Sequence, residues 1–217
     1  MKTIIAAIVL CFLLIGGGIY LALRPSKPQP RQLALSPAYV QHQKDGFLER
    51  GAAKPKVVVT EYGDFQCPAC YKFEPTLAAA MLQTADIAQL QFKQYPISKL
   101  HDKAQLGALA SEAAGRQGKF WEMHDLLYKE QPTWEPDTVV SFRDRLSGYA
   151  KSLNLNADQF NADLDDSTTA DLIAADIAQG DADKLQGTPD ILINGKPTEA
   201  IPQSIDALVA LIRQAAQ

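Results

Sequence analysis

The first strong apolar pattern of the folded region is a β-branched run that predicts a buried strand over Val57–Tyr62. The run is continuous, which indicates burial on both faces. Beyond a short loop, apolar side chains recur at helical spacing and predict a helix from about Pro68, with one stripe facing the core. That stripe consists of Cys70, Phe73, Leu77 and Met81.

Residues Ala88–Ile97 predict a second strand, so strand, helix and strand form one βαβ unit with a right-handed crossover. From about His101 to Leu185 the pattern turns helical. Before the first strand, Val40–Arg50 is compatible with a short helix. We therefore expect a sheet interrupted by a block of helices.

Sheet character returns near the C-terminus. Ile191–Ile193 predicts a strand, and Asn194-Gly195 is a strong hairpin signal. We expect the second strand of this hairpin near Pro197–Ala200, and Ser204–Ala216 predicts a last amphipathic helix. The full order is βαβ, a helical block, then ββα, which is an α/β fold.

The N-terminal segment has a different character. Ile4–Leu23 carries no charged side chain, and a helix of that length spans roughly 30 Å, the thickness of a bilayer core. A cleaved signal peptide is the alternative, but no small-x-small site follows the apolar run. We expect an uncleaved membrane anchor over residues 1–24 and a proline-containing linker and lead-in over residues 25–53. The folded domain is expected over residues 54–217.

Charge and cysteine content narrow the function. The chain has 217 residues and a formal net charge of −4, and its basic residues form no stripe, which argues against nucleic-acid binding. Only three cysteines occur: Cys11, Cys67 and Cys70. One close pair and one distant cysteine indicate a working site rather than a disulfide scaffold.

The cysteine pair stands where the predicted helix begins. Residues three apart lie on one helical turn, so the sulfurs of Cys67 and Cys70 can meet. Unpaired N–H groups at the helix start favour a thiolate at Cys67, and Pro68 is well tolerated at the first helical position. We expect Cys67 to be the exposed nucleophile and Cys70, on the apolar stripe, the buried resolving thiol. A zinc half-site and a purely structural disulfide are the alternatives; no metal or cofactor is expected.

Glu61 lies within the predicted buried strand. A buried carboxyl is costly without a partner or a task, and burial raises its pKa. It could take a proton from Cys70 as a mixed disulfide resolves. The alternative is an ion pair with a lysine such as Lys93. His124, on an apolar helical face, is interpreted as a satisfied core histidine.

Pro189 precedes the third predicted strand. It is either an ordinary strand-edge proline or a cis proline in a tight turn. In the second case it would leave the backbone of Thr188 free to pair with an extended substrate peptide.

Three stretches together resemble the DsbA-like thiol–disulfide oxidoreductases, and more closely their membrane-anchored bacterial branch. They are Phe65–Cys70 (FQCPAC), Gly118–His124 (GKFWEMH) and Gly187–Gly195 (GTPDILING). The resemblance covers about Lys54 to the C-terminus. It implies a thioredoxin fold with a helical insertion at about residues 98–186, in which Cys67 attacks and Cys70 resolves through a redox-active disulfide. It also implies that Glu61 is the buried acid and that Thr188 and cis-Pro189 contact substrate.

The family is extracytoplasmic. The resemblance therefore implies a single-pass protein of the bacterial inner membrane, with its catalytic domain in the periplasm or otherwise outside the cytoplasm. It would introduce disulfides into cysteine-containing exported proteins and be reoxidised by a membrane quinone-linked thiol oxidase. Strong oxidants of the family carry histidine in place of Ala69 and valine in place of Thr188. A reductase or isomerase, or a non-enzymatic anchored chaperone, therefore stays an alternative. One thioredoxin unit and its helical insertion account for the whole folded region and leave no separate dimerisation domain, so we expect a monomer.

Overall fold

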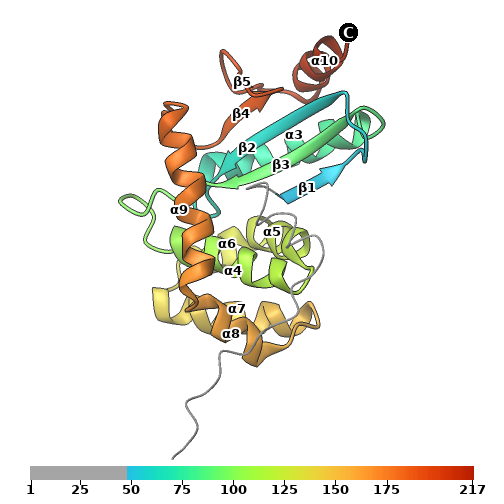
Figure 1. The fold of residues 1–217 in the computed structure, drawn as a ribbon. Helices are drawn as coiled ribbons and strands as arrows, with labels where there is room; N and C mark the ends of the chain where they lie inside the picture. Colours follow the sequence, from blue (N-terminus) through green and yellow to red (C-terminus); the bar gives the residue numbers. More distant parts are fainter. Residues whose placement is uncertain (1–47) are drawn as a thin grey trace, which may run out of the picture. The chain divides into compact units, whose positions relative to one another are not determined.

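The computed structural model describes residues 48–217, drawn in colour in Figure 1. The predicted anchor and most of the linker lie outside the described residues. Within the described part of the chain, no helix is both long and apolar enough to cross a membrane.

A mixed five-stranded sheet organises the described domain, in the order β1-β3-β2-β4-β5. Its strands are β1 (Leu48–Gly51), β2 (Val57–Gly63), β3 (Ala88–Gln94), β4 (Asp190–Ile193) and β5 (Lys196–Pro197). Strands β2 and β3 are parallel, while the pairs β1–β3, β2–β4 and β4–β5 are antiparallel. The predicted first strand is thus confirmed as the middle strand, which explains its burial on both faces.

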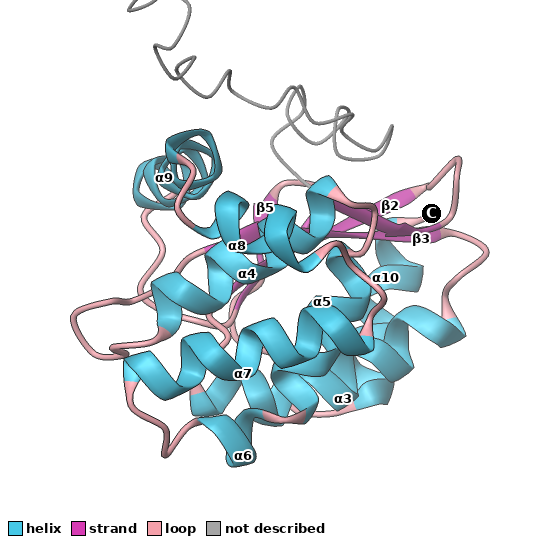
Figure 2. Cartoon of the chain, turned by 90° about the horizontal axis from the view of Figure 1, so that it is seen from below, coloured by secondary structure: helices cyan, strands magenta, loops and turns pink. Residues whose placement is uncertain are grey.

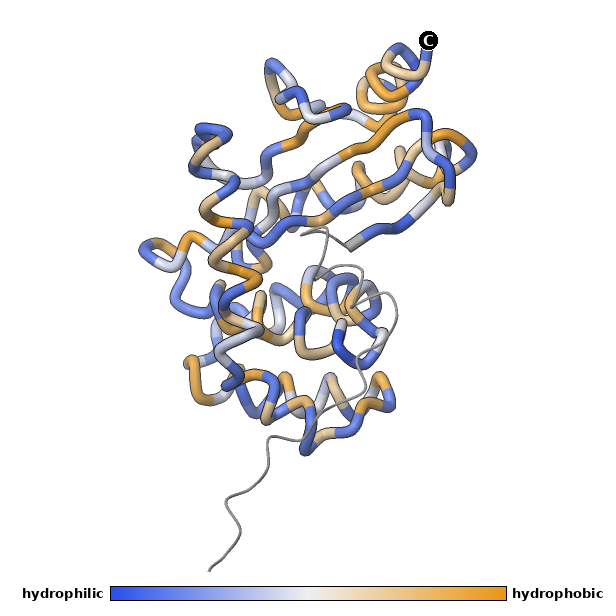
Figure 3. The backbone as a smooth tube through the Cα atoms, viewed as in Figure 1, coloured by the Kyte–Doolittle hydropathy of each residue, from blue (hydrophilic) through white to orange (hydrophobic). Residues whose placement is uncertain are grey.

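Helices α3 (Pro68–Gln83) and α10 (Ile205–Ala215) pack on one face of this sheet. Their apolar side chains enclose a core with β2 and β3, and Figure 3 shows the hydrophobic colour following the first half of β2. Helix α3 begins at Pro68 as predicted, and its expected stripe is buried: Cys70, Phe73, Leu77 and Met81.

The helical block is inserted between β3 and β4 (Figure 2). It comprises α4 (Ala104–Arg116), α5 (Phe120–Lys129), α6 (Gln131–Trp134), α7 (Val139–Ser152), α8 (Ala157–Leu164) and α9 (Ser167–Ala182). A second core lies within it and reaches the cysteine loop through Phe65 and Cys70. Helix α8 is capped by Asn156, whose side-chain oxygen accepts a hydrogen bond from the Gln159 N–H at 3.0 Å.

The last hairpin also follows the sequence. Asn194 and Gly195 have φ values of 50° and 74°, the left-handed conformation of a two-residue hairpin turn. Helix α10 begins after Ser204, whose hydroxyl accepts a hydrogen bond from the Ala207 N–H.

Three elements differ from expectation. The second strand of the last hairpin was expected near Pro197–Ala200, but β5 comprises only Lys196–Pro197. Leu48–Gly51, the end of the segment compatible with a helix, forms edge strand β1 instead. It pairs with β3, and Arg50 adds an ion pair to Asp125 at 2.7 Å, so contacts distant in sequence override the local pattern. Strand β3 ends at Gln94 rather than Ile97, whose N–H instead donates to the Asp64 carboxylate at 2.9 Å.

A substitution at Gly63, the last residue of β2, can test how closely the sheet packs against the insertion. A Cβ at this position would lie 2.5 Å from Cε2 of Phe92 and 2.8 Å from the Tyr128 hydroxyl. We expect Gly63→Ala to lower the free energy of unfolding by about 1–3 kcal/mol, as overpacking typically does. The matched control is Gly148→Ala in α7, where a Cβ meets nothing within 4 Å, and which should add ~0.5–1 kcal/mol. Urea unfolding of both variants measures this, and equal effects would contradict the packing argument.

Candidate active site

The cysteine pair lies at the start of α3, just after the loop that follows β2. Cys67 is the N-cap residue of α3, Pro68 occupies the first turn, and both cysteines are free thiols. Cys70 is fully buried, and Cys67 is only 6% exposed. The expectation of an exposed Cys67 is therefore wrong in degree, because the backbone around Thr188 and the insertion cover most of its side chain.

Hydrogen bonding separates the two thiols chemically. The pKa of Cys67 is lowered from 9.0 to about 5. The hydrogen bond from Cys70 contributes most to this lowering, and Thr188 and the backbone N–H groups of Cys70 and Ala69 add to it, while burial acts in the opposite direction. Burial raises the pKa of Cys70, and its hydrogen bond to Cys67 and the charge of Glu61 raise it further. At neutral pH the reduced pair thus combines a thiolate at Cys67 with a protonated Cys70.

The peptide bond between Thr188 and Pro189 is cis, which confirms the second of the two interpretations of this proline. The carbonyl oxygen of Thr188 lies 3.4 Å from Sγ of Cys67. A cavity of about 410 Å³ opens beside this contact, and its walls include Ala69, Phe73 and Pro189. An extended chain placed in this cavity would lie beside Thr188, whose carbonyl oxygen is next to Cys67.

Two side chains that the sequence did not single out hold the cysteine loop. The carboxylate of Asp64 accepts hydrogen bonds from the N–H groups of Gln66 and Ile97. The amide of Gln131, at the start of α6, donates to the carbonyl oxygens of Phe65 at 2.7 Å and Cys67 at 3.1 Å. No sequence pattern marks Gln131, because its partners lie more than sixty positions away.

Glu61 continues the apolar row of Val57 and Val59 on the face of β2 that packs against α3 and α10. It is fully buried, and neither carboxyl oxygen has a partner among the described residues. The ion pair with Lys93 does not form: Lys93 lies opposite Tyr62, so its side chain leaves the other face of the sheet and pairs with Asp176 at 3.1 Å. Burial raises the pKa of Glu61 well above its usual value, and the nearby charge of Glu74 raises it further.

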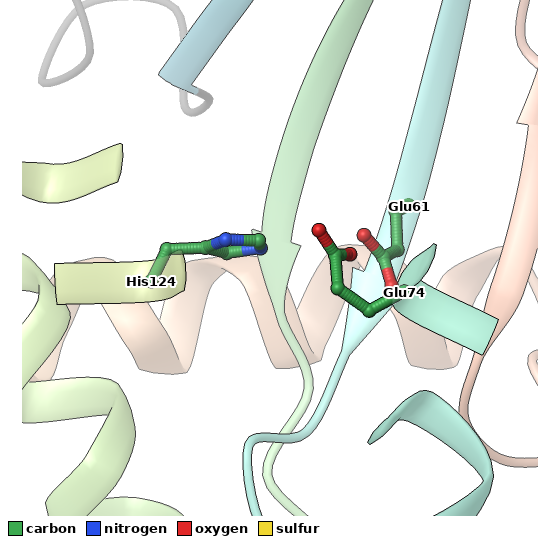
Figure 4. Close-up of side chains that lie close together, drawn as sticks. All are labelled: Glu61, Glu74 and His124. Atoms are coloured by element: carbon green, nitrogen blue, oxygen red, sulfur yellow. The ribbon is translucent and has the colours of Figure 1, made fainter. Parts of the chain in front are cut away.

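Glu61 shares its surroundings with Glu74 of α3 and His124 of α5. One ligand-type atom from each lies within 4.8 Å of the others, and Figure 4 shows the imidazole directed at the two carboxyl groups. The sequence did not single out Glu74. Its signal was present, since an acid four residues after Cys70 lies on the same side of the helix.

His124 is a core residue, as expected, but it is not satisfied. Five aromatic rings surround it: Phe65, Phe92, Phe120, Trp121 and Tyr128. Its Nδ1 lies 3.0 Å from the carboxylate of Asp125, while Nε2 has no partner among the described residues. Carboxylate and imidazole groups also bind divalent cations, so a bound cation is the alternative that an experiment on this cluster has to exclude.

Comparison with known proteins places this geometry in a family. A family model described as thioredoxin matches residues 44–214. BdbD from Bacillus subtilis, in its oxidised crystal structure, is 26% identical with a TM-score of 0.66, over 79% of this chain and 93% of that one. MdbA from Corynebacterium diphtheriae, a thiol-disulfide oxidoreductase, shares the fold at 17% identity and a TM-score of 0.62, over 79% and 90% of the two chains. The chain belongs to the thioredoxin family, and it shares the fold of solved thiol-disulfide oxidoreductases such as MdbA.

Relatives by sequence include longer proteins. Na(+)/H(+) antiporter NhaA 1 of Salinispora arenicola is 37% identical over 166 residues, which is 76% of this chain and 24% of that protein. A protein of the same name from Mycolicibacterium gilvum is 30% identical over 149 residues, or 68% and 23% of the two chains. The chain thus spans about a quarter of the length of these relatives.

The thiolate at Cys67 can be measured directly. Ultraviolet titration of the reduced chain should show one thiolate forming with a midpoint near pH 5. Cys70→Ala should raise this midpoint, because it removes the largest lowering influence. The pKa of Cys67 is lower in the folded chain than in the unfolded chain, so ionisation of Cys67 stabilises the folded reduced form. This contribution to the free energy of unfolding is complete above the unfolded pKa, and it is lost as the pH falls through about 5. A midpoint near ~8.5, the value of a free cysteine, would contradict the argument.

Proposed function

We propose that the chain introduces disulfides into cysteine-containing exported proteins through a redox-active disulfide between Cys67 and Cys70. The observation that carries this proposal is the placement of the two thiols: Cys67 is the N-cap of α3 beside the Thr188 carbonyl, and Cys70 is buried one turn further on. This placement lowers the pKa of Cys67 and raises that of Cys70. A thiolate that is stable when released is a good leaving group, which favours passing the disulfide on to a substrate.

In the oxidising step, a substrate thiolate attacks Sγ of Cys67 and the Cys67–Cys70 bond breaks. Cys70 departs as a thiolate and takes a proton, and a mixed disulfide joins substrate to Cys67. A second thiolate of the same substrate then attacks the substrate sulfur of the mixed disulfide. This forms the substrate disulfide and releases Cys67 as a thiolate. The substrate loses two electrons and the cysteine pair gains them.

Reoxidation runs through the same atoms. The Cys67 thiolate attacks a disulfide of the oxidant and forms a new mixed disulfide. Cys70 must then lose its proton to attack Cys67, and we assign Glu61 as the acceptor, because its charge acts on Cys70 and it has no other partner among the described residues. We propose a membrane quinone-linked thiol oxidase as the reoxidising partner.

Substrate is proposed to bind along Thr188 and Pro189. The Thr188 carbonyl beside Cys67 and the adjoining cavity support an extended peptide as the bound form. We further propose residues 1–24 as a single-pass anchor in the bacterial inner membrane, followed by a linker and a monomeric domain in the periplasm or otherwise outside the cytoplasm. Because strand β1 pairs with β3, we include Leu48–Gly51 in this domain, which therefore begins before residue 54. The uncharged run at Ile4–Leu23 and the family membership support this arrangement.

A reductase or isomerase of the same fold is the main alternative, favoured by Ala69 and Thr188 where strong oxidants of the family have histidine and valine. A non-enzymatic chaperone is a second alternative, for which Cys67→Ala should leave the cellular phenotype intact. Loss of function in that variant would exclude the chaperone.

The redox potential decides between oxidase and reductase. The low pKa of Cys67 stabilises the reduced pair, so equilibration with glutathione should give a potential well above thioredoxin's, toward the oxidising end of a scale that runs from about −270 to about −120 mV. Cys70→Ala, which cannot form the internal disulfide, is the control. A potential near about −270 mV would overturn the oxidase assignment in favour of a reductase.

The role of Glu61 is tested by Glu61→Gln, which keeps the shape and removes the proton acceptor. With glutathione disulfide as oxidant, formation of the mixed disulfide depends on Cys67, whereas its release by Cys70 depends on Glu61. We expect release to slow by roughly 10²-fold, the lower range for general acid–base groups, and formation to change little. Rapid acid quench and mass analysis separate the two steps. Equal slowing of both would contradict the assignment.

A further inference from the structure

Asp64 is the first residue after β2, and it opens the loop that ends at Cys67. Its main chain contacts both cysteines. The Asp64 carbonyl oxygen accepts a hydrogen bond from the Cys67 N–H at 3.0 Å, and the Asp64 N–H donates to the thiol of Cys70. A displacement of Asp64 would therefore move the backbone that holds the two sulfurs.

The side chain of Asp64 fixes that main chain in place. Its carboxylate is buried, and it accepts the N–H of Gln66 at 2.8 Å through Oδ1 and the N–H of Ile97 at 2.9 Å through Oδ2. Oδ2 also lies 2.7 Å from Nδ1 of His101, whose side chain is 18% exposed. An ionised carboxylate only accepts hydrogen bonds, so Nδ1 of His101 carries the proton in this contact.

We propose that His101 positions the cysteine pair through Asp64 and thereby sets how readily the Cys67–Cys70 disulfide is reduced. His101 is a positioning residue, because its effect on the sulfurs passes through the main chain of Asp64. The inference rests on the proposed function, since it names a side chain that tunes the proposed reaction.

The loop that carries His101 is itself fastened to the cysteine loop on both sides of the imidazole. Ile97 precedes His101 and donates to Asp64. After His101, the Lys103 N–H donates to Oε1 of Gln66 at 2.6 Å, and Nε2 of Gln66 donates to Asp102 at 3.0 Å. The imidazole is thus held at the carboxylate by the surrounding backbone, and little side-chain entropy is lost when it makes this hydrogen bond.

Loss of the imidazole would act on the position of Asp64. A buried carboxylate is costly unless it is paired and hydrogen-bonded, and removing one partner leaves part of this cost uncompensated. The carboxylate of Asp64 would then shift toward water, and its main chain would shift with it. Both hydrogen bonds between Asp64 and the cysteines would be weakened by this movement.

The cysteine chemistry depends on this placement. The N–H groups of Ala69 and Cys70 reach Sγ of Cys67 because Cys67 is the N-cap of α3. The side chain of Ala69 has no donor of its own, so the local stabilisation of a thiolate depends on the backbone. Hydrogen bonds to a thiolate exist only in the reduced form. Weakening them would therefore favour the oxidised pair and make the chain a weaker oxidant.

The ultraviolet titration and the glutathione equilibrium of reduced chains test this role. In His101→Ala we expect the Cys67 midpoint to rise by about one pH unit from its value near 5. The equilibrium should shift roughly tenfold toward the oxidised pair, which lowers the potential by about 30 mV.

His101→Asn is the conservative variant. Its amide nitrogen can take the place of Nδ1 and donate to Asp64, so it should restore most of the midpoint and of the potential. An imidazole that only filled space would be missed equally in both variants, because asparagine is also smaller than histidine. Thermal unfolding checks that each variant folds. If His101→Ala does not fold, His101→Gln replaces it, since the longer side chain moves the amide away from the Nδ1 position.

A double-mutant cycle tests whether His101 acts through Asp64. Asp64→Asn should shift the midpoint in the same direction as His101→Ala, and adding His101→Ala to it should change little more. Two full additive shifts would show separate routes and contradict the proposal. Arg143→Gln is the control: it removes an exposed ion pair of similar length, to Asp165 at 2.6 Å, and should leave midpoint and potential unchanged.

The outcomes for the positioning role and for the proposed function are distinct. If His101→Ala keeps the wild-type midpoint and potential, or if His101→Asn loses as much as His101→Ala, the positioning role is wrong while the proposed function stands. A wild-type potential near about −270 mV would overturn the oxidase assignment. The difference between wild type and His101→Ala would still decide the positioning role in that case.

Discussion

The pairing of β2 with both of its neighbours is the constraint on which the rest of the site depends. The antiparallel register of β2 and β4 sets Tyr62 opposite Asp190. The end of β2 therefore lies beside the start of β4, which brings the Thr188–Pro189 bond to the loop that carries Cys67. The parallel register with β3 sets Gly63 opposite Gln94 at the same end, so the chain leaving β3 reaches the Asp64 carboxylate. One strand thus assembles three loops that are distant in sequence.

The same strand places a carboxyl where packing alone would favour an apolar side chain. Its neighbours across the sheet, Phe92 and Ile191, are both buried. Burying an unpaired carboxylate is costly, and the group responds by holding its proton more tightly. A proton acceptor beside a buried thiol needs this property, since an ordinary carboxylate is too weak a base to deprotonate a thiol. The loss of stability and the gain in basicity have one physical origin.

Local signals were enough to predict the elements that depend on local physics. The β-branched run of β2, Pro68 at the start of α3 and the Asn194-Gly195 turn all act over a few residues, and each was placed correctly. Edge strand β1 was missed because it is stabilised by pairing with β3 some forty positions away. The cysteine pair was visible because its two members share a helical turn. The cluster around Glu61 was not visible as a group, because Glu74 and His124 meet Glu61 only after α5 has packed on α3.

The two hydrogen bonds from Gln131 make the insertion more than a cover for the cysteines. They fix the carbonyl groups of Phe65 and Cys67 from a helix that is separate from the sheet. Ordering one residue's backbone costs about 1–2 kcal/mol in conformational entropy. Here that cost is met once, when the domain folds, rather than at each encounter with a substrate. The insertion therefore preorganises the loop that carries Cys67, so that its sulfur is already in position when a substrate binds.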